Sequence, residues 1–128
     1  MTSYNTQRSP LCVDPFALRN YKVITRKQQQ ISECIQLFRG MDPRFPINAI
    51  QVFFYVAEHG SCLKQDMELA LNFNPATGSR NSDYLSNNHR LRKPGMGLIT
   101  KEDYPPDRRN SILSLTDKGR QLLDAIAN

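Results

Sequence analysis

The sequence lacks most features that identify an enzyme, a metalloprotein or a disulfide-stabilised protein. Its three cysteines, Cys12, Cys34 and Cys62, are scattered, and no Cys-x-x-Cys or Cys-x-x-His pair indicates a zinc site or a disulfide framework. The two histidines, His59 and His89, have no acid or nucleophile at a spacing typical of catalysis, and no glycine-rich phosphate loop is present. We therefore expect no enzyme activity, no metal and no cofactor.

Long apolar runs are also missing. The N-terminus has no apolar segment of the signal-peptide type, and no stretch approaches the roughly 18 apolar residues of a membrane span. Few cysteines fit a reducing compartment. We expect a cytoplasmic protein with no membrane contact, whose 128 residues are enough for a real hydrophobic core.

Positive charge is in excess and lies at both ends of the sequence. The formal net charge is +5 and the pI is about 9.3. Residues 1–46 contain seven Lys and Arg against three Asp and Glu, residues 47–79 contain one against three, and residues 80–120 contain nine against five. This excess favours a polyanionic partner. The middle part is typical of a buried scaffold between contact elements.

Residues 97–123 predict a basic β-hairpin followed by a helix. Leu98–Thr100 begin a strand, two adjacent prolines break it, and Ile112–Leu115 form the returning strand. The tip of this hairpin carries Arg108 and Arg109. A two-stranded flap with arginines at its tip, next to helices, is typical of the wing of a winged-helix DNA-binding domain.

The residues around this hairpin resemble the wing of the MarR family of bacterial winged-helix regulators. In that family a Gly-Leu-hydrophobic triplet opens the first wing strand, Asp-x-Arg lies in the turn, and Leu-Thr-x-x-Gly begins the next helix. The matching positions are Gly97-Leu98-Ile99, Asp107 with Arg109, and Leu115-Thr116-Asp117-Lys118-Gly119. Thr116 is also the predicted N-cap of that helix, with an acid in its first turn.

The resemblance implies a mainly α-helical winged helix-turn-helix with a small antiparallel β-hairpin, which binds duplex DNA as a homodimer. It implies that Arg109 enters the minor groove or clamps its backbone, while Asp107 orients an arginine. The family usually has a long C-terminal dimer helix, whereas this sequence ends at Asn128. We therefore assign the dimer contact to the N-terminal helix. No residue identifies a small-molecule or protein effector.

The chain is predicted to divide into an N-terminal arm (1–15), a helical segment with a linker (16–46) and the winged-helix domain (47–128). The helix is expected over residues 16–38, interrupted near 23–25, with Gly40 as its C′ residue. Its apolar face contains Ile31, Cys34, Ile35 and Phe38, and we predict dimer contacts at Ile31, Ile35 and Phe38. The alternative is that this surface folds back onto the protomer's own core. Cys34 on this stripe favours an inert thiol over a redox sensor.

The next two helices are predicted to form the scaffold of the DNA-binding unit. Pro46 fits the first position of a helix that is apolar nearly all round and ends at His59-Gly60. This helix is the expected centre of the domain. A second helix follows, with Met67 and Leu71 on its inner face.

Two registers compete for the recognition helix. In the first, Asn74 caps a helix that begins at Pro75, and its inner face is poor core material: Gly78, Asn81 and Ser82. In the second, Ser82 caps a helix that reaches about residue 92, with Tyr84, Leu85 and Leu91 facing inward. We prefer the second register because its inner face is apolar.

Side chains of the types that contact DNA cluster in and around this helix. Asn pairs bidentately with adenine and Arg with guanine, while other basic side chains hold phosphates. The predicted DNA-contacting residues are Arg80, Ser86, Asn87, Asn88, Arg90, Arg92, Lys93, Lys101, Arg108 and Arg109.

The sequence therefore predicts a sequence-specific double-stranded DNA-binding transcriptional regulator, most simply a repressor. One rival is a winged helix that binds protein, as an inhibitor or assembly factor. Another is a replication- or recombination-associated DNA-binding protein, which the sequence does not separate from a repressor.

Overall fold

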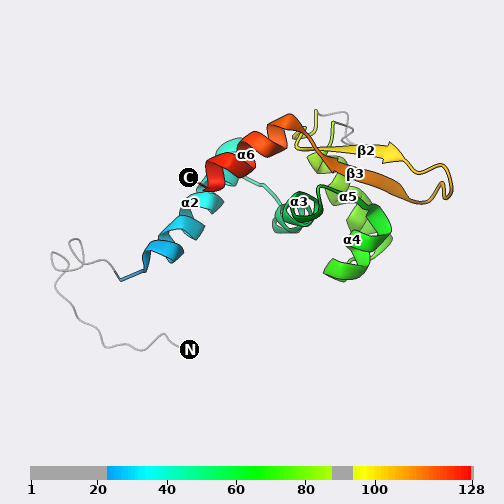
Figure 1. Cartoon of the computed structure of the whole chain (residues 1–128). Helices are drawn as coiled ribbons and strands as arrows, with labels where there is room; N and C mark the ends of the chain where they lie inside the picture. Colours follow the sequence, from blue (N-terminus) through cyan, green and yellow to red (C-terminus); the bar gives the residue numbers. More distant parts are fainter. Residues whose placement is uncertain (1–22, 88–93, 128) are drawn as a thin grey trace. The chain divides into compact units, whose positions relative to one another are not determined.

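The computed structural model describes residues 23–87 and 94–127, and the chain divides into two units, residues 1–32 and 33–128. The described elements are five helices and three strands (Figure 1). In chain order they are α2 (Arg26–Met41), α3 (Ile47–His59), β1 (Ser61–Leu63), α4 (Lys64–Leu71), α5 (Pro75–Leu85), β2 (Ile99–Asp103), β3 (Ser111–Leu115) and α6 (Asp117–Ala127).

Helix α2 begins with a capping box. The Oγ1 of Thr25 accepts a hydrogen bond from the Gln28 amide (3.1 Å), and the Gln28 Oε1 accepts one from the Thr25 amide (2.9 Å). This start agrees with the interruption predicted near residues 23–25. The predicted end at residue 38 was wrong by three residues, because Gly40 keeps a negative φ and the helix continues to Met41.

The hydrophobic core is built around α3, as the sequence predicts. Four residues of this helix, Ala49, Val52, Phe53 and Val56, are fully buried. The other buried apolar side chains come from α2, α4, α5 and the hairpin: Phe38, Met67, Leu85, Leu98, Ile99 and Leu113. Gly60, with φ at 74°, ends α3 after the predicted His59.

The hairpin belongs to a three-stranded antiparallel sheet with the order β1-β3-β2. Strands β2 and β3 form the predicted hairpin, in which Ile99 pairs with Leu115 and Asp103 with Ser111. Strand β1 was not predicted, since three residues are too few to show an alternating pattern. It pairs Ser61 with Ser114 and thereby ties the hairpin to the start of α4.

Thr116 links the segment before β2 to the first turn of α6. Its Oγ1 donates to the Gly97 carbonyl (2.7 Å) and accepts from the Gly119 amide (3.0 Å), which confirms the predicted N-cap geometry. A Cβ on Gly119 would lie 2.4 Å from the Leu98 carbonyl oxygen. The Leu-Thr-x-x-Gly motif therefore allows the first turn of α6 to pack directly against the segment leading into β2.

Within the part of the chain that the structure describes, no helix combines the length and the apolar character needed to cross a bilayer.

Candidate nucleic-acid interface

Helix α5 adopts the first of the two competing registers, so our preferred register was wrong. The Oδ1 of Asn74 accepts a hydrogen bond from the Thr77 amide (2.8 Å), and Pro75 occupies the first helical turn. The helix ends at Leu85, where the Leu85 carbonyl accepts from the Leu98 amide (2.8 Å). Ser82 lies inside the helix and does not cap it.

The polar inner face of α5 is stable because its side chains find partners within the helix. The Asn81 Nδ2 donates to the Thr77 carbonyl (2.8 Å), and the Ser82 Oγ donates to the Ser79 carbonyl (3.2 Å). Both residues are buried, at 5% and 0% exposure. A buried polar group is costly only when its hydrogen bonds are unsatisfied. Our argument from apolar character therefore gave the wrong register.

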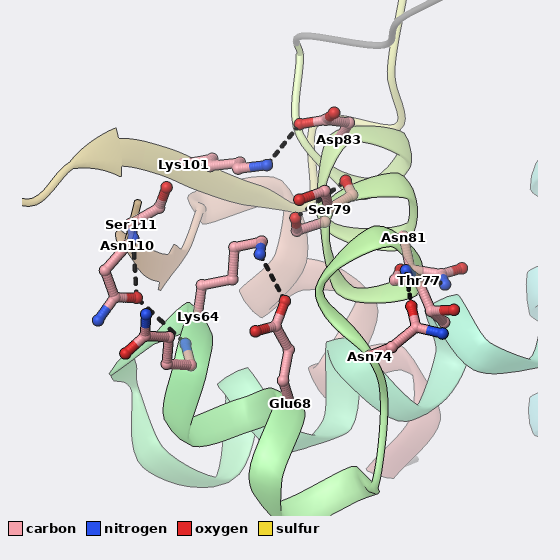
Figure 2. A network of polar contacts seen from close by, with 12 residues as sticks. Lys64, Glu68, Asn74, Thr77, Ser79, Asn81, Asp83, Lys101, Asn110 and Ser111 are labelled. Atoms are coloured by element: carbon pink, nitrogen blue, oxygen red, sulfur yellow. Dashed lines mark hydrogen bonds and ion pairs between the residues drawn. The ribbon is translucent and has the colours of Figure 1, made fainter. Parts of the chain in front are cut away.

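Gly78 lets α4 and α5 approach each other closely. A Cβ at this position would lie 2.0 Å from the Glu68 Oε2, which in turn pairs with the ammonium group of Lys64. Figure 2 shows this ion pair of α4 beside α5. Lys64 and Glu68 are only 5% and 6% exposed. The two helices of the helix-turn-helix thus meet at a buried ion pair, and any larger residue at position 78 would require the Glu68 side chain to move.

The outer face of α5 differs from the one we predicted. Ala76 and Arg80 are exposed and Ser79 is half-buried, so these three side chains are available on the solvent side of the helix. Sequence reasoning missed Ala76 and Ser79 because the other register placed them in a turn. The signal that could have found them was the Asn-Pro pair at residues 74 and 75, a strong helix-start sequence.

The other residues of this region that were predicted to contact DNA differ in where the structure places them. Ser86 is buried, with its Oγ donating to the Asp83 carbonyl (3.0 Å), so it does not face solvent as predicted. Asn87 is exposed. Asn88, Arg90, Arg92 and Lys93 lie outside the described residues, as does the predicted continuation of the helix to residue 92.

The wing tip is a folded turn that exposes two arginines. The Asp107 amide donates to the Tyr104 carbonyl, and the Asp107 Oδ1 accepts from the Arg109 amide, each at 3.0 Å. The Nε of Arg109 lies 3.9 Å from the same oxygen, but its side chain is 93% exposed, so this ion pair contributes little. Asp107 therefore orients the backbone of the tip more than the guanidinium. Arg108 is also exposed.

Lys101 does not face solvent as a free DNA contact. Its ammonium pairs with the carboxylate of Asp83, so strand β2 is linked to helix α5 (Figure 2). Because this pair holds the wing against α5, Lys101 helps to fix the position of the wing relative to this helix. Its charge is neutralised by Asp83 and adds no unpaired positive charge to the candidate interface.

Helix α5 and the wing tip border one hollow of about 710 Å³. Its lining comes from α4, the start of α5 and the wing: Lys64, Gln65, Glu68, Leu69, Phe73, Pro75, Ser79 and Arg109. The wing arginine and the outer side of α5 therefore lie on the same concave surface. Because the Lys64 ammonium is already paired with Glu68, the open positive charge at its rim comes from Arg109.

A separate apolar groove of about 490 Å³ lies along α3. It is lined by Ile50, Phe54 and Tyr55 of α3 together with Leu71 and Leu123.

Two titratable groups outside the interface, Tyr84 and Cys34, are half-buried. Burial and the hydrogen bond donated to Asp42 raise the pKa of Tyr84 far above its usual value. Burial also raises the pKa of the Cys34 thiol, which lowers its thiolate fraction at neutral pH. Among residues 23–87 and 94–127, no group of three or more His, Cys, Asp or Glu side chains could hold a metal ion.

The residues predicted at a subunit contact separate into two kinds. Ile31 and Ile35 of α2 are 54% and 51% exposed. Phe38, in contrast, is 1% exposed and packs edge-to-face against Phe45 and Phe53 at centroid distances of 5.0 and 5.8 Å. Phe38 therefore belongs to the core of its own chain, as the alternative reading of this helix expected.

The succession α3, β1, α4, α5, β2 and β3 defines a winged helix-turn-helix, in which α4 and α5 form the helix-turn-helix and the β2–β3 hairpin is the wing. Solved structures of similar fold include AbsC, a MarR family transcriptional regulator from Streptomyces coelicolor (17% identity, 84% of this chain and 75% of that chain, TM-score 0.52). RV1404 from Mycobacterium tuberculosis is also similar, with 18% identity, coverage of 93% of this chain and 75% of that chain, and a TM-score of 0.58. The structure of reduced AbfR bound to DNA has 18% identity, covers 79% of this chain and 70% of that chain, and gives a TM-score of 0.55. The resemblance to MarR regulators is thus confirmed at the level of the fold.

In sequence, the chain is similar to an uncharacterized HTH-type transcriptional regulator of Bacillus subtilis (strain 168), YhbI, with 27% identity over 108 residues. The match spans 83% of this chain but 61% of that relative's length. No profile of a known protein family matches the chain. YhbI and AbsC are transcriptional regulators, which are not enzymes, in agreement with what the sequence led us to expect.

Proposed function

We propose that this protein is a MarR-type transcriptional regulator that binds double-stranded DNA through α5 and the wing, and that it acts as a repressor. One observation carries the proposal: Ser79 of α5 and Arg109 of the wing line the same hollow. A convex helix face next to a basic flap fits a major groove and the adjoining backbone or minor groove. The DNA-bound state of the similar AbfR structure supports the same use of this fold.

In this arrangement the exposed side chains divide into two roles. Ala76, Ser79 and Arg80 lie on the outer face of α5 and would meet base edges, where Arg pairs with guanine and Ala contacts the thymine methyl group. Arg108 and Arg109 would neutralise phosphates or enter the minor groove.

We further propose a homodimer that uses the exposed apolar face of α2. Ile31 and Ile35 lie four residues apart and so on one side of the helix, and both are more than half exposed. A dimer would place two copies of α5 on successive half-sites of an operator.

The first test measures binding to a fluorescently labelled, mixed-sequence DNA duplex over a range of salt concentrations. The double variant R108A/R109A is expected to weaken binding and to reduce the slope of log K against log salt by about two units, one for each lost phosphate contact. The matched control is R39A/R44A, which removes the same charge from exposed positions outside the hollow. Equal effects of both variants would overturn the proposal in favour of non-specific attraction.

Footprinting on the DNA around the protein's own gene tests the regulatory role. Protection that overlaps a promoter, together with reduced transcription in vitro, is the expected result for a repressor. A protein that protects no DNA would instead favour the rival role as a protein-binding module.

A further inference from the structure

Asn110 is a buried polar residue at the junction of the wing tip and strand β3. It is only 5% exposed, although asparagine in a turn normally faces water. It follows the two tip arginines directly and precedes Ser111, the first residue of β3. Figure 2 shows its side chain directed toward the start of α4. Its burial therefore requires a partner in another element.

That partner is the first turn of α4. The Asn110 Oδ1 accepts a hydrogen bond from the Gln65 amide (3.1 Å), which comes from a residue 45 positions earlier in the chain, and a second one from the Ser111 amide (2.9 Å). The residue at the N-cap of α4 is Leu63, whose side chain makes no cap bond. The amides of a first helical turn have no partner within the helix. Asn110 thus supplies from the wing the cap that α4 lacks in its own sequence.

The same residue also closes the turn that holds the arginines. The Asn110 amide donates to the Asp107 carbonyl (3.0 Å). Arg108 and Arg109 therefore lie inside a turn whose two ends, Asp107 and Asn110, are hydrogen-bonded to each other. Asp107 fixes one end through the bond from the Arg109 amide. Through Asn110 the other end is attached to α4, which lines the hollow beside α5. Asn110 therefore contributes to the placement of the arginines relative to α5, together with the Lys101–Asp83 pair and the pairing of β1 with β3.

We propose that Asn110 is a positioning residue of the DNA-binding surface: it caps α4 from the wing and thereby holds Arg108 and Arg109 beside α5. This inference rests on the proposed function for its consequence in DNA binding. The cap itself is independent of DNA. Because Asn110 caps α4 and also closes the turn at the wing tip, it links the orientation of this turn to the start of the helix-turn-helix.

The cap is tested by amide hydrogen exchange, which needs no DNA. In the wild-type protein the Gln65 amide is expected to be protected, and in N110A its exchange should accelerate by about tenfold or more. N110D keeps an oxygen acceptor at a helix N-terminus and should restore the protection. N48A removes an asparagine side chain from α3 and should leave the Gln65 amide unchanged. Unaltered Gln65 exchange in N110A would overturn the inference.

The consequence for the arginines is tested by combining variants in the duplex-binding assay. N110A is expected to weaken binding of the mixed-sequence duplex and to reduce the salt slope by about one to two units. Adding R108A/R109A to N110A should then weaken binding by less than about twofold, because the arginines are no longer held in place. A purely structural role for Asn110 would leave the salt slope and the full effect of R108A/R109A unchanged, and this result would refute the positioning role. A wild-type protein that binds no duplex would overturn the proposed function and the positioning role with it, while Gln65 exchange still decides the cap.

Discussion

The ammonium of Lys101 lies 2.7 Å from the Oδ1 of Asp83, and the two side chains are only 16% and 15% exposed. A residue of the wing and a residue of the candidate recognition helix are therefore joined by an ion pair that is largely shielded from water. Shielding makes such a pair sensitive to the loss of either partner, since the remaining charge is left in a poorly solvated position.

We expect K101M to lower the free energy of unfolding by about 1–3 kcal/mol, less than for a fully buried pair because some solvent reaches both groups. Urea unfolding measures this loss. The control is R120M, since Arg120 and Asp117 form an exposed pair with side chains 64% and 92% accessible, and its loss should cost less than about 0.5 kcal/mol. Equal losses in the two variants would show that the Lys101–Asp83 pair is no better shielded than a surface pair.

Gly78→Ala should destabilise the protein by about 1–3 kcal/mol, because the new methyl group would overlap the carboxylate of Glu68. Thermal or urea unfolding gives the change. The matched control is Gly40→Ala, where no atom lies within 4 Å of the added Cβ and where alanine favours the helix by about 1 kcal/mol. The two substitutions should therefore have opposite signs. A neutral Gly78→Ala would mean that α4 and α5 separate easily.

Ile35→Glu should dissociate the proposed homodimer, because it places a charge on the exposed apolar face of α2. Sedimentation equilibrium of the variant should give the mass of one chain, and its duplex affinity should fall. Gln36→Glu adds the same charge at an exposed neighbouring position and should leave the oligomeric state unchanged. A dimer that persists in Ile35→Glu would remove α2 from the interface.

Burial, with a smaller contribution from Asp66, raises the pKa of the Cys62 thiol to about 11. In a Cys12→Ser/Cys34→Ser protein, the rate of alkylation by iodoacetamide should therefore rise with a midpoint near pH 11 and not near 9. The folded state keeps the proton more tightly than the unfolded state does. The resulting stability is present below pH 9 and is lost as the pH rises to about 11. Cys62→Ser should remove this part of the alkaline dependence, and an alkylation midpoint near 9 would show that the thiol is open to solvent.

The elements with strong local signals were predictable from the sequence. The apolar α3, the proline-interrupted hairpin and the Thr116 cap each depend on residues that are close in the chain, and all three are present in the structure. The short strand β1 was not predictable, because it exists only through pairing with β3. The same holds for the cap on α4, whose donor and acceptor are 45 residues apart.

The candidate site was harder to predict than the fold for a specific physical reason. We judged the inner face of α5 by its apolar character, whereas Asn81 and Ser82 are buried with hydrogen bonds to carbonyls of their own helix. This choice misplaced the outer face by several residues. The wing arginines were correctly placed at the tip of the hairpin because the turn around Asp107 is local, and their contact with DNA stays a prediction. The pairing of Lys101 with Asp83 required knowledge of how the wing packs on α5.

The buried polar side chains of α5 form their hydrogen bonds within the helix itself. This has a consequence for how a winged helix of this kind can acquire new DNA targets. Asn81 and Ser82 need no side chain of α4 to satisfy them, and the fold at this helix depends on Gly78 and the cap at Asn74. Ala76, Ser79 and Arg80 on the opposite side are therefore free to be exchanged, singly or together, with little penalty in folding. Libraries randomised at these three positions should yield stable variants of altered operator preference.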